Sequence, residues 1–480
     1  MSTLFNVQEV LRPWKSEVRE LKEAEDPKEK LSIQLCYRGV DEETGDIDYA
    51  QATKYVLKRC KLFYDSSTDD YYIKNRKKNV TQQISKVAMK RLITHIFEEA
   101  DESYFVPGWS DKILKTMENY VDSYSEKPME SAVWSFPNGD YDIQTMEFGP
   151  AKKDTINYHV MDFDYDEESD CPIFKKAMRE ICCEDETMLM LLQEVTGYCL
   201  DKGSARAQKL IYAWGRGSNG KSLWTETIRM ILPQEIVSSQ SLHGMHQRFA
   251  LSNVSESAVN ISPEVSAETI LDSSVIKAVT SGNDIVDIEK KYQDKKSRVI
   301  TTKFICCSNH FLKSKDTSDG FFRRILVLPF EKRFVAENDP TRTPDCGIID
   351  LSLSQKIFRE RAGIYNWAIE GLVRLRKNDY QFTPYVRSEE LKKEFMYKSN
   401  VLKSFVSDCL TLSKSSKISS PDLHIAFMKW AENKGFETAE YENKNKFHKH
   451  FKDELSRAGM VVKMRKIQGK KFYVGFEIKM

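Results

Sequence analysis

The chain has 480 residues, enough for about three domains of roughly 150 residues each. Apolar residues make up 40% and charged residues 30%, an ordinary folded composition that excludes disordered and collagen-like classes. The 73 Lys and Arg balance the 72 Asp and Glu, so the net charge of +1 indicates no partner for the whole chain. No signal-peptide core or membrane-span stretch is present, and ten cysteines without a C-x-x-C pair indicate a reducing compartment. We therefore expect a cytoplasmic protein without a membrane partner.

The first 125 residues are charged, and their pattern predicts a mainly helical region. Ile84, Ala88, Leu92 and Ile96 recur every four residues, as on one face of a helix. Nothing in this range indicates a role.

Residues 126–204 are predicted to form a small domain with both helices and strands. Between 130 and 165, aromatic residues, Pro137 and the pair Asn138-Gly139 are typical of short strands and turns. A helical pattern follows over 186–200.

Residues 205–380 alternate apolar β-runs with helical patterns, which predicts an α/β fold with a parallel sheet. A long amphipathic helix is expected around 364–375. The expected strands are 210–214, 258–261, 302–307 and 325–330.

The last part of the chain is predicted to be a separate basic domain, 399–480, after a charged linker at 381–398. Residues 401–480 hold 16 Lys and Arg against 9 Asp and Glu, a net charge of +7, so the other 400 residues carry −6. Two helices, 421–434 and 445–458, precede two strands between 461 and 478 that turn at Gln468-Gly469-Lys470. Helices followed by a β-hairpin are the pattern of a winged helix.

A phosphate-binding loop lies between the first expected strand and an amphipathic helix. The motif G-x-x-x-x-G-K-S places glycines where backbone N–H groups turn toward phosphate oxygens, at the positive end of the following helix. Lys221 would reach the β- and γ-phosphates of a nucleotide, and the Ser222 hydroxyl would ligate Mg²⁺. The expected nucleotide-binding residues are Gly215, Gly217, Ser218, Asn219, Gly220, Lys221 and Ser222.

Polar residues at the ends of the neighbouring strands indicate the kind of nucleotide enzyme. Glu264 follows the strand 258–261 and is the candidate Mg²⁺ ligand or base that orients attacking water. Asn309 follows the strand 302–307, where its amide could hold the water or the γ-phosphate. Arg323 and Arg324 precede the last strand and suit a finger that reaches a nucleotide held by a neighbouring subunit.

The order and spacing of these motifs resemble superfamily 3 helicases, in the lineage of poxvirus and phage or plasmid primase-helicases. An additional motif between the acidic and the Asn strands matches as well, at Thr280-Ser281-Gly282-Asn283-Asp284 and Glu289-Lys290-Lys291-Tyr292. The resemblance covers about residues 130–480 and matches 1–125 only loosely. One departure is Pro263, where the lineage commonly has Asp.

The resemblance implies an ATPase of the AAA+ type that assembles as a ring, with a hexamer as the expected form and with ATP and Mg²⁺ at subunit interfaces. Lys221 and Ser222 would bind phosphate and Mg²⁺, Glu264 would be the acidic catalytic residue and metal ligand, and Asn309 would be the polar sensor. Arg324 would be the finger in preference to Arg323, although the sequence does not separate the two.

Two groups of residues are expected to contact DNA. The resemblance places 288–298 as a hairpin in the ring channel, where lysines can track phosphates of a single strand and Tyr292 can stack on a base. Basic residues on the second helix and the wing of the C-terminal domain would bind origin duplex. The expected contacts are Lys290, Lys291, Tyr292, Lys295 and Lys296 in the hairpin, and Lys446, Lys449, Lys463, Arg465, Lys466, Lys470 and Lys471 in the C-terminal domain.

The sequence thus predicts an ATP-dependent DNA helicase and replication initiator of a phage, plasmid or phage-inducible chromosomal island. Because residues 1–125 show no acidic site of a primase, a separate primase and host replication proteins are expected as partners. Two alternatives stay open: a DNA-binding regulator in which ATP only switches assembly, and a packaging or partition ATPase.

Overall fold

A computed structural model gives the fold of the chain in two compact units, 1–166 and 167–480. Within the residues that the structure describes, no helix has the length and apolar character needed to cross a membrane. The unit boundary falls inside the range 126–204 that we expected as one domain, and the domain limits given above stay predictions. The described residues are 48–59, 61–65, 70–74, 81–100, 108–121, 132–151, 159–262, 270–271, 273–289, 295–311, 313–314, 316, 318–436, 438–460 and 463–479.

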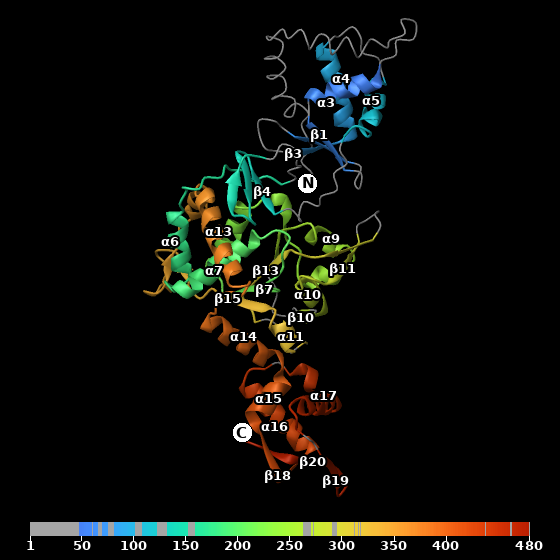
Figure 1. Cartoon of the computed structure of the whole chain (residues 1–480). Helices are drawn as coiled ribbons and strands as arrows, with labels where there is room; N and C mark the ends of the chain where they lie inside the picture. Colours follow the sequence, from blue (N-terminus) through green and yellow to red (C-terminus); the bar gives the residue numbers. More distant parts are fainter. Residues whose placement is uncertain are drawn as a thin grey trace. The chain divides into compact units, whose positions relative to one another are not determined.

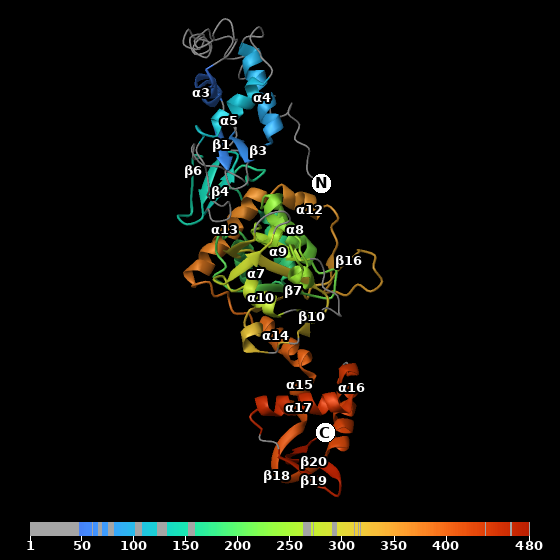
Figure 2. The same cartoon turned by 90° about the vertical axis from the view of Figure 1, so that its right-hand side faces the viewer.

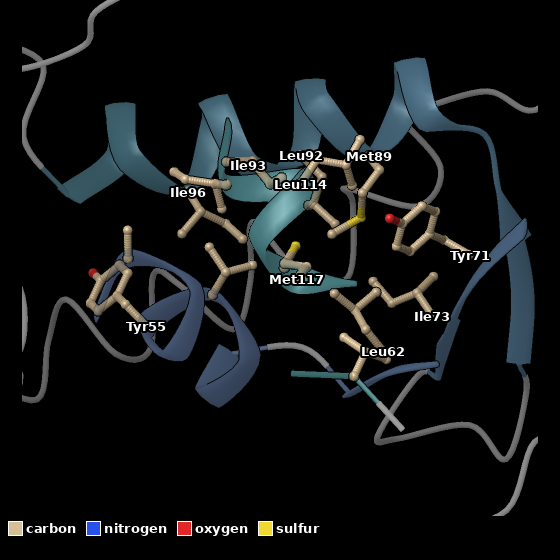
Figure 3. Close-up of a cluster of buried hydrophobic side chains, with 14 of the residues drawn as sticks. Tyr55, Leu62, Tyr71, Ile73, Met89, Leu92, Ile93, Ile96, Leu114 and Met117 are labelled. Carbon is tan, nitrogen blue, oxygen red and sulfur yellow. The ribbon is translucent and has the colours of Figure 1, made fainter. Parts of the chain in front are cut away.

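The first unit begins with helices packed on a three-stranded antiparallel sheet of order β1-β2-β3. Figure 3 shows its core, in which Leu62, Tyr71 and Ile73 of the sheet face Leu92 and other apolar side chains of the helices. Helices hold most of the residues in the described elements here, as expected, but the sheet was not predicted. The elements are α3 (Tyr49–Arg59), β1 (Lys61–Asp65), β2 (Asp70–Lys74), β3 (Thr81–Ile84), α4 (Lys86–Ala100) and α5 (Trp109–Met117).

The four-residue spacing that predicted one helix face in this region joins two elements. Ile84 ends β3, whereas Leu92 and Ile96 lie on α4, and all three side chains are buried in the same core. A short strand followed by a helix can imitate helical spacing when both bury their apolar residues together.

A second antiparallel sheet, β4-β5-β6, confirms the short strands and turns predicted between 130 and 165. Asn138, in the turn between the first two strands, exchanges two hydrogen bonds with the backbone of Tyr165 at 2.8 and 3.0 Å. The strands are β4 (Val133–Phe136), β5 (Gly139–Asp142) and β6 (Glu147–Gly149).

The second unit contains a five-stranded parallel sheet of order β15-β7-β13-β9-β8, which confirms the predicted α/β fold. Its two central strands are buried almost throughout because helices and neighbouring segments cover both faces. Figure 1 shows β7, β13 and β15 side by side in the middle of this unit. The strands are β7 (Leu210–Trp214), β8 (Val237–Ser238), β9 (Val259–Ser262), β13 (Lys303–Ser308) and β15 (Ile325–Pro329).

Helices and short strands surround this sheet, with α8 following β7 directly (Figure 2). The helices are α6 (Pro172–Ile181), α7 (Glu186–Cys199), α8 (Lys221–Met230), α9 (Ala250–Val254), α10 (Ser273–Val279), α11 (Asp319–Phe322) and α12 (Leu353–Phe358). The short strands are β10 (Ile270–Leu271), β11 (Ile285–Ile288), β12 (Lys296–Val299), β14 (Lys313–Ser314), β16 (Phe334–Val335) and β17 (Gly347–Ile348), and single 3₁₀ turns lie at Gln234–Ile236 and His243–His246.

The predicted long helix is α13 (Arg361–Lys377), which packs closely against α7 (Figure 1). Glycines permit this approach: a Cβ atom on Gly197 would lie 2.2 Å from the Ala368 carbonyl oxygen, and one on Gly371 would lie 2.3 Å from that of Gln193. Glu194 and Arg374 form an ion pair across the contact at 2.7 Å.

The segment expected as a linker is largely a helix, α14 (Val386–Ser399), which packs on β15. Leu391 and Phe395 are buried in the same core as the sheet, and the Ser388 hydroxyl donates to the Val327 carbonyl oxygen at 2.6 Å. Only three positions of this helix are buried and one is a serine, so its apolar pattern is too sparse to identify from the sequence.

The C-terminal module has three helices on one side of a three-stranded antiparallel sheet of order β18-β20-β19, as both views show (Figures 1 and 2). The two predicted helices and two predicted strands are confirmed, and one further helix and strand precede them. The elements are α15 (Val401–Cys409), β18 (Leu410–Ser419), α16 (Ser420–Asn433), a 3₁₀ turn at Ala439–Tyr441, α17 (Lys444–Arg457), β19 (Lys463–Ile467) and β20 (Lys470–Ile478).

Candidate nucleotide-binding site

The glycine-rich loop connects the carboxyl end of β7 to the N-terminus of α8. Gly217, Ser218 and Gly220 have φ angles of 101°, 45° and 87°, in the left-handed region. Glycine adopts this region without a steric penalty, and successive N–H groups in such a turn can point to one centre. The local backbone is therefore shaped as an anion cradle.

Asn219 fastens this loop to the end of β15. Its side-chain amide donates to the Phe330 carbonyl oxygen at 2.9 Å, and the residue is 4% exposed. Gly215 leaves room for this contact, because a Cβ atom there would lie 2.0 Å from Asn219 Nδ2 and 2.3 Å from the Phe330 oxygen. The side chain of Asn219 thus positions the loop backbone, and the residue also lines the cavity described below.

The ammonium group of Lys221 is held by neutral oxygens at the wall of a cavity. Nζ donates to the Gly215 carbonyl at 2.7 Å, to Asn309 Oδ1 at 3.0 Å and to Asn219 Oδ1 at 3.1 Å. Lys221 begins α8, after β7, and Asn309 follows β13, so the two side chains meet at the carboxyl ends of these neighbouring parallel strands. The ammonium group of Lys221 can in turn attract phosphate oxygens of a ligand.

The cavity beside Lys221 has a volume of about 990 Å³, at the upper end of the size range for small-molecule sites. The loop, Ser262 at the end of β9 and Asn309 after β13 line one side. Glu264, the candidate acidic residue, lies outside the described residues. Ser222 lies on the cavity wall, in the first turn of α8, and is exposed.

The other wall of the cavity comes from segments that carry none of the motifs. On α6, Lys176 and Glu180 line it, and Lys356 on α12 lines it together with Asp350. Lys356 pairs with Asp350 at 2.7 Å, and this hydrogen bond, with those from Ser352, lowers the pKa of the Asp350 carboxyl to about 2. No motif in the sequence identifies these residues, because they reach the cavity only through folding.

The two candidate finger arginines lie where the strands of the sheet begin, whereas the loop lies where they end. They precede Ile325, which pairs with the first residue of β7, whereas the loop follows the last residue of β7. At about 3.3 Å per residue, the five-residue strand β15 separates the two edges by about 13 Å. Arg323 and Arg324 are therefore placed away from the nucleotide cavity of their own chain.

The two arginines differ in their surroundings. Arg323 is exposed. Arg324 is half-buried, donates from Nη1 to the Gly320 carbonyl at 2.6 Å, and has a pKa that burial lowers.

Neighbouring residues before β7 connect the arginine pair to the expected hairpin. The Lys209 ammonium donates to the Arg323 carbonyl at 2.5 Å, and the Gln208 amide donates to the Ser281 carbonyl at 2.6 Å. The hairpin itself is the antiparallel pair β11–β12, in which Ile288 faces Lys296.

The expected DNA contacts of this hairpin are only partly described. Lys295 is exposed and pairs with Asp287 at 2.8 Å, a contact that raises the lysine pKa and lowers that of the aspartate. Lys296 opens β12. Lys290, Lys291 and Tyr292 lie outside the described residues.

The C-terminal basic residues lie on α17 and on the hairpin β19–β20. Lys446, Lys449, Lys463, Arg465, Lys466, Lys470 and Lys471 are all exposed, and Lys446 pairs with Glu440 at 2.8 Å. The hydroxyl oxygen of Tyr473 on β20 and Nδ1 of His448 on α17 lie 3.1 Å apart and form a hydrogen bond. Burial, followed by the positive charges of His424, Lys452 and Lys471, lowers the pKa of His448 to about 4.

Comparison with known families gives three matches along the chain. The family described as "D5 N terminal like" matches residues 16–183, a family of unknown function (DUF5906) matches 213–324, and the family described as "Poxvirus D5 protein-like" matches 397–476. D5 families thus match on both sides of the nucleotide site, in the order expected from the sequence motifs. The chain is therefore similar to the D5 lineage over these two ranges.

The chain is also similar to two viral proteins. It is 21% identical over 343 residues to "Putative helicase 121R" of Invertebrate iridescent virus 3, which covers 65% of this chain and 36% of the relative. It is 22% identical over 400 residues to "Putative helicase L207/L206" of Acanthamoeba polyphaga mimivirus, covering 78% and 40%. The chain therefore spans about two-fifths of the length of these relatives.

Among solved structures, the C-terminal region of NrS-1 in its apo form has the same fold. The match has a TM-score of 0.52 at 14% identity and covers 90% of this chain and 99% of that chain. At this identity the likeness concerns the fold alone.

Proposed function

We propose that the chain is an ATP-dependent DNA helicase that starts replication and works as a ring, with a hexamer as the expected form. The observation that carries the proposal is the contact of Lys221 with Asn309 beside the cavity, because a phosphate-loop cation and a polar sensor then face the same ligand. The helicase names of the two viral relatives support the activity.

In this proposal the chain's own residues bind and orient ATP. The loop N–H groups hold the phosphates, Lys221 attracts the β- and γ-phosphates, and Asn309 positions the water or the γ-phosphate. Ser222, exposed at the cavity, and Glu264 would hold Mg²⁺, which neutralises phosphate charge when bound. The Ser222 hydroxyl and a carboxylate are the oxygen ligands that Mg²⁺ prefers.

The position of the arginine pair supports action between subunits. Because Arg323 and Arg324 lie one strand length from the loop of their own chain, they can act only on the nucleotide of another copy. We expected Arg324 to be the finger, but the exposure of Arg323 favours Arg323 for this role, with Arg324 holding the turn through Gly320.

DNA contacts are proposed at two places. The hairpin β11–β12, with Lys295, Lys296 and the residues at 290–292, would contact a single strand in the ring channel. The C-terminal module would be a winged helix, which its order of α15, β18, α16, α17, β19 and β20 supports, and would bind origin duplex. A separate primase and host replication proteins would be its partners.

The test is strand displacement on forked DNA with ATP and Mg²⁺, with wild type beside Lys221→Ala and Glu264→Gln. We expect unwinding by wild type, and no ATP hydrolysis or unwinding by either variant. ATP-dependent DNA binding without displacement, equal in wild type and Glu264→Gln, would favour the ATP-switched regulator. Movement along duplex without separation of strands would favour the packaging or partition ATPase.

A further inference from the structure

The basic residues of the C-terminal hairpin are divided between the two faces of its sheet. Side chains of successive strand residues point to opposite faces, and residues paired across strands share a face. Tyr473 is fully buried against the helices and pairs with Ile418 and Met464, so this face is the helix side. Lys471 and its partner Lys466 belong to the helix side by alternation.

The opposite face, which we call the outer sheet face, carries a ring of cations around an aromatic side chain. Phe472 pairs with Arg465 on β19, and Val474 pairs with both Lys463 on β19 and Lys417 on β18. The ammonium of Lys417 lies 5.8 Å from the centre of the Phe472 ring. The outer sheet face comprises Lys417, Lys463, Arg465, Lys470, Phe472 and Val474.

Positive charge on the outer sheet face is exposed, and the acidic residue of these strands, Glu477 near the other end of β20, pairs with Lys479 at 3.9 Å rather than with this face. Lys417, Lys463, Arg465 and Lys470 are all exposed, and none forms an ion pair with another part of the chain that the structure describes. Like charges gathered on one sheet face oppose folding. Such an arrangement is favourable when a polyanion covers it.

The half-buried Phe472 indicates which polyanion fits. Phosphates can pair with the flanking cations, but a phenyl ring gains a partner only from a base that is free to stack. Bases inside a duplex are stacked on one another, whereas those of a single strand are accessible. The helix side, with Lys471 near His448 of α17 and Lys466 paired with Lys471, faces away from this surface.

We propose that the outer sheet face binds single-stranded DNA. Lys463, Arg465 and Lys470, which the sequence pattern assigned to duplex, would then contact a separated strand, and the duplex contacts would remain with Lys466 and Lys471 on the helix side and with Lys446 and Lys449 of α17. This inference rests on the proposal that the chain acts on DNA. One module would then contact both the duplex and a strand separated from it.

The experiment compares two double variants of the full chain that each remove two positive charges. Lys463→Gln with Arg465→Gln changes the outer sheet face, and Lys466→Gln with Lys471→Gln is the matched control on the helix side. Fluorescent oligothymidylate and a blunt duplex are the probes, titrated over a range of salt concentrations without ATP. Phe472→Leu keeps an apolar side chain and removes the aromatic ring.

We expect the outer-face variant to bind oligothymidylate about tenfold more weakly, to show a salt slope smaller by about 1.4, and to keep its duplex affinity. The control should lose duplex affinity and keep its affinity for oligothymidylate. Ultraviolet cross-linking of oligothymidylate should label the peptide that contains Phe472 in wild type but not in Phe472→Leu, whose melting temperature checks folding.

Equal loss of oligothymidylate affinity in both double variants, or no loss in the outer-face variant, would overturn the inference. Competition by polyglutamate as effective as by unlabelled oligothymidylate would overturn it too, and would indicate an acidic protein partner. Unwinding by wild type is measured in parallel. If wild type unwinds DNA but the variants do not show the expected binding differences, only this inference is wrong. If wild type binds no DNA at all, the proposed function itself is wrong.

Discussion

At the scale of single residues, the contact between Lys221 and Asn309 is the most informative about how the cavity would bind a nucleotide. The two side chains lie 88 positions apart in the chain and meet at 3.0 Å. The Asn309 amide accepts a hydrogen bond from Lys221. When Lys221 binds a nucleotide phosphate instead, the amide can form a hydrogen bond with that phosphate or with water.

Replacing Asn309 by Ala should slow hydrolysis and leave ATP binding nearly intact. Loss of one positioned polar group commonly lowers kcat by about 10²-fold, because the group acts on the transition state. The measurement is steady-state ATPase activity beside equilibrium binding of ATP. A change confined to KM would show that Asn309 acts in binding alone.

Lys303, buried at the start of β13, predicts a pH dependence of stability. Burial lowers its pKa from 10.5 to about 8, although its ammonium donates to the backbone oxygen of Asp201. Between pH 8 and 10.5 the unfolded chain therefore binds this proton while the folded chain does not, so rising pH removes a penalty on folding.

The prediction is tested with Lys303→Met, which cannot titrate. Over this pH window, wild type should gain stability relative to the variant by about 1.4 kcal/mol per pH unit. Urea unfolding of both proteins at several pH values measures this difference. A difference that stays constant with pH would contradict the assignment.

At the scale of elements, short polar segments were the least predictable. The strands β7, β13 and β15 were identified because each is a continuous apolar run buried on both faces. The sheet β1–β3 was missed because its strands have four or five residues and mix tyrosine and lysine with few aliphatic positions. Helix α14 was taken for a linker because only Ser388, Leu391 and Phe395 are buried on it.

If α14 is part of the sheet's core, Leu391→Ala should destabilise the protein by about 2–5 kcal/mol, as expected for a fully buried leucine. The matched control is Val386→Ala, at a position that is 75% exposed on the same helix. Urea unfolding measures both. Equally small losses of stability in both variants would show that residues 386–399 act as a linker.

At the scale of the whole molecule, the phosphate loop and the arginine pair lie at opposite ends of the sheet strands. In the proposed function, such a chain would form a complete site only beside a second copy. Ring assembly with shared sites follows from this geometry as a proposal.

Mixing two inactive variants tests whether sites are shared. Lys221→Ala lacks the loop cation and Arg323→Ala lacks the exposed arginine, so each alone should hydrolyse little ATP. In a mixture, some interfaces join an intact loop to an intact arginine, and part of the activity should return. Parallel mixing with Arg324→Ala separates the two arginines, and a mixture that stays inactive with both would contradict action in trans.

The sequence by itself determined the parallel sheet, the phosphate loop, the long helix α13 and the basic C-terminal module. These features are local: a buried strand is an apolar run, a phosphate cradle is a glycine pattern, and charge can be counted. Its motif order also indicated a resemblance to poxvirus and phage or plasmid primase-helicases, which the matches to two D5 families confirm.

Only the tertiary structure decided which residues meet. The contact of Lys221 with Asn309, the cavity wall from α6 and α12, and the division of basic residues between two sheet faces depend on pairing between distant segments. Such pairing is set by strand order and register, which no local pattern encodes. A one-residue shift in register would move every cation of β19 to the other face.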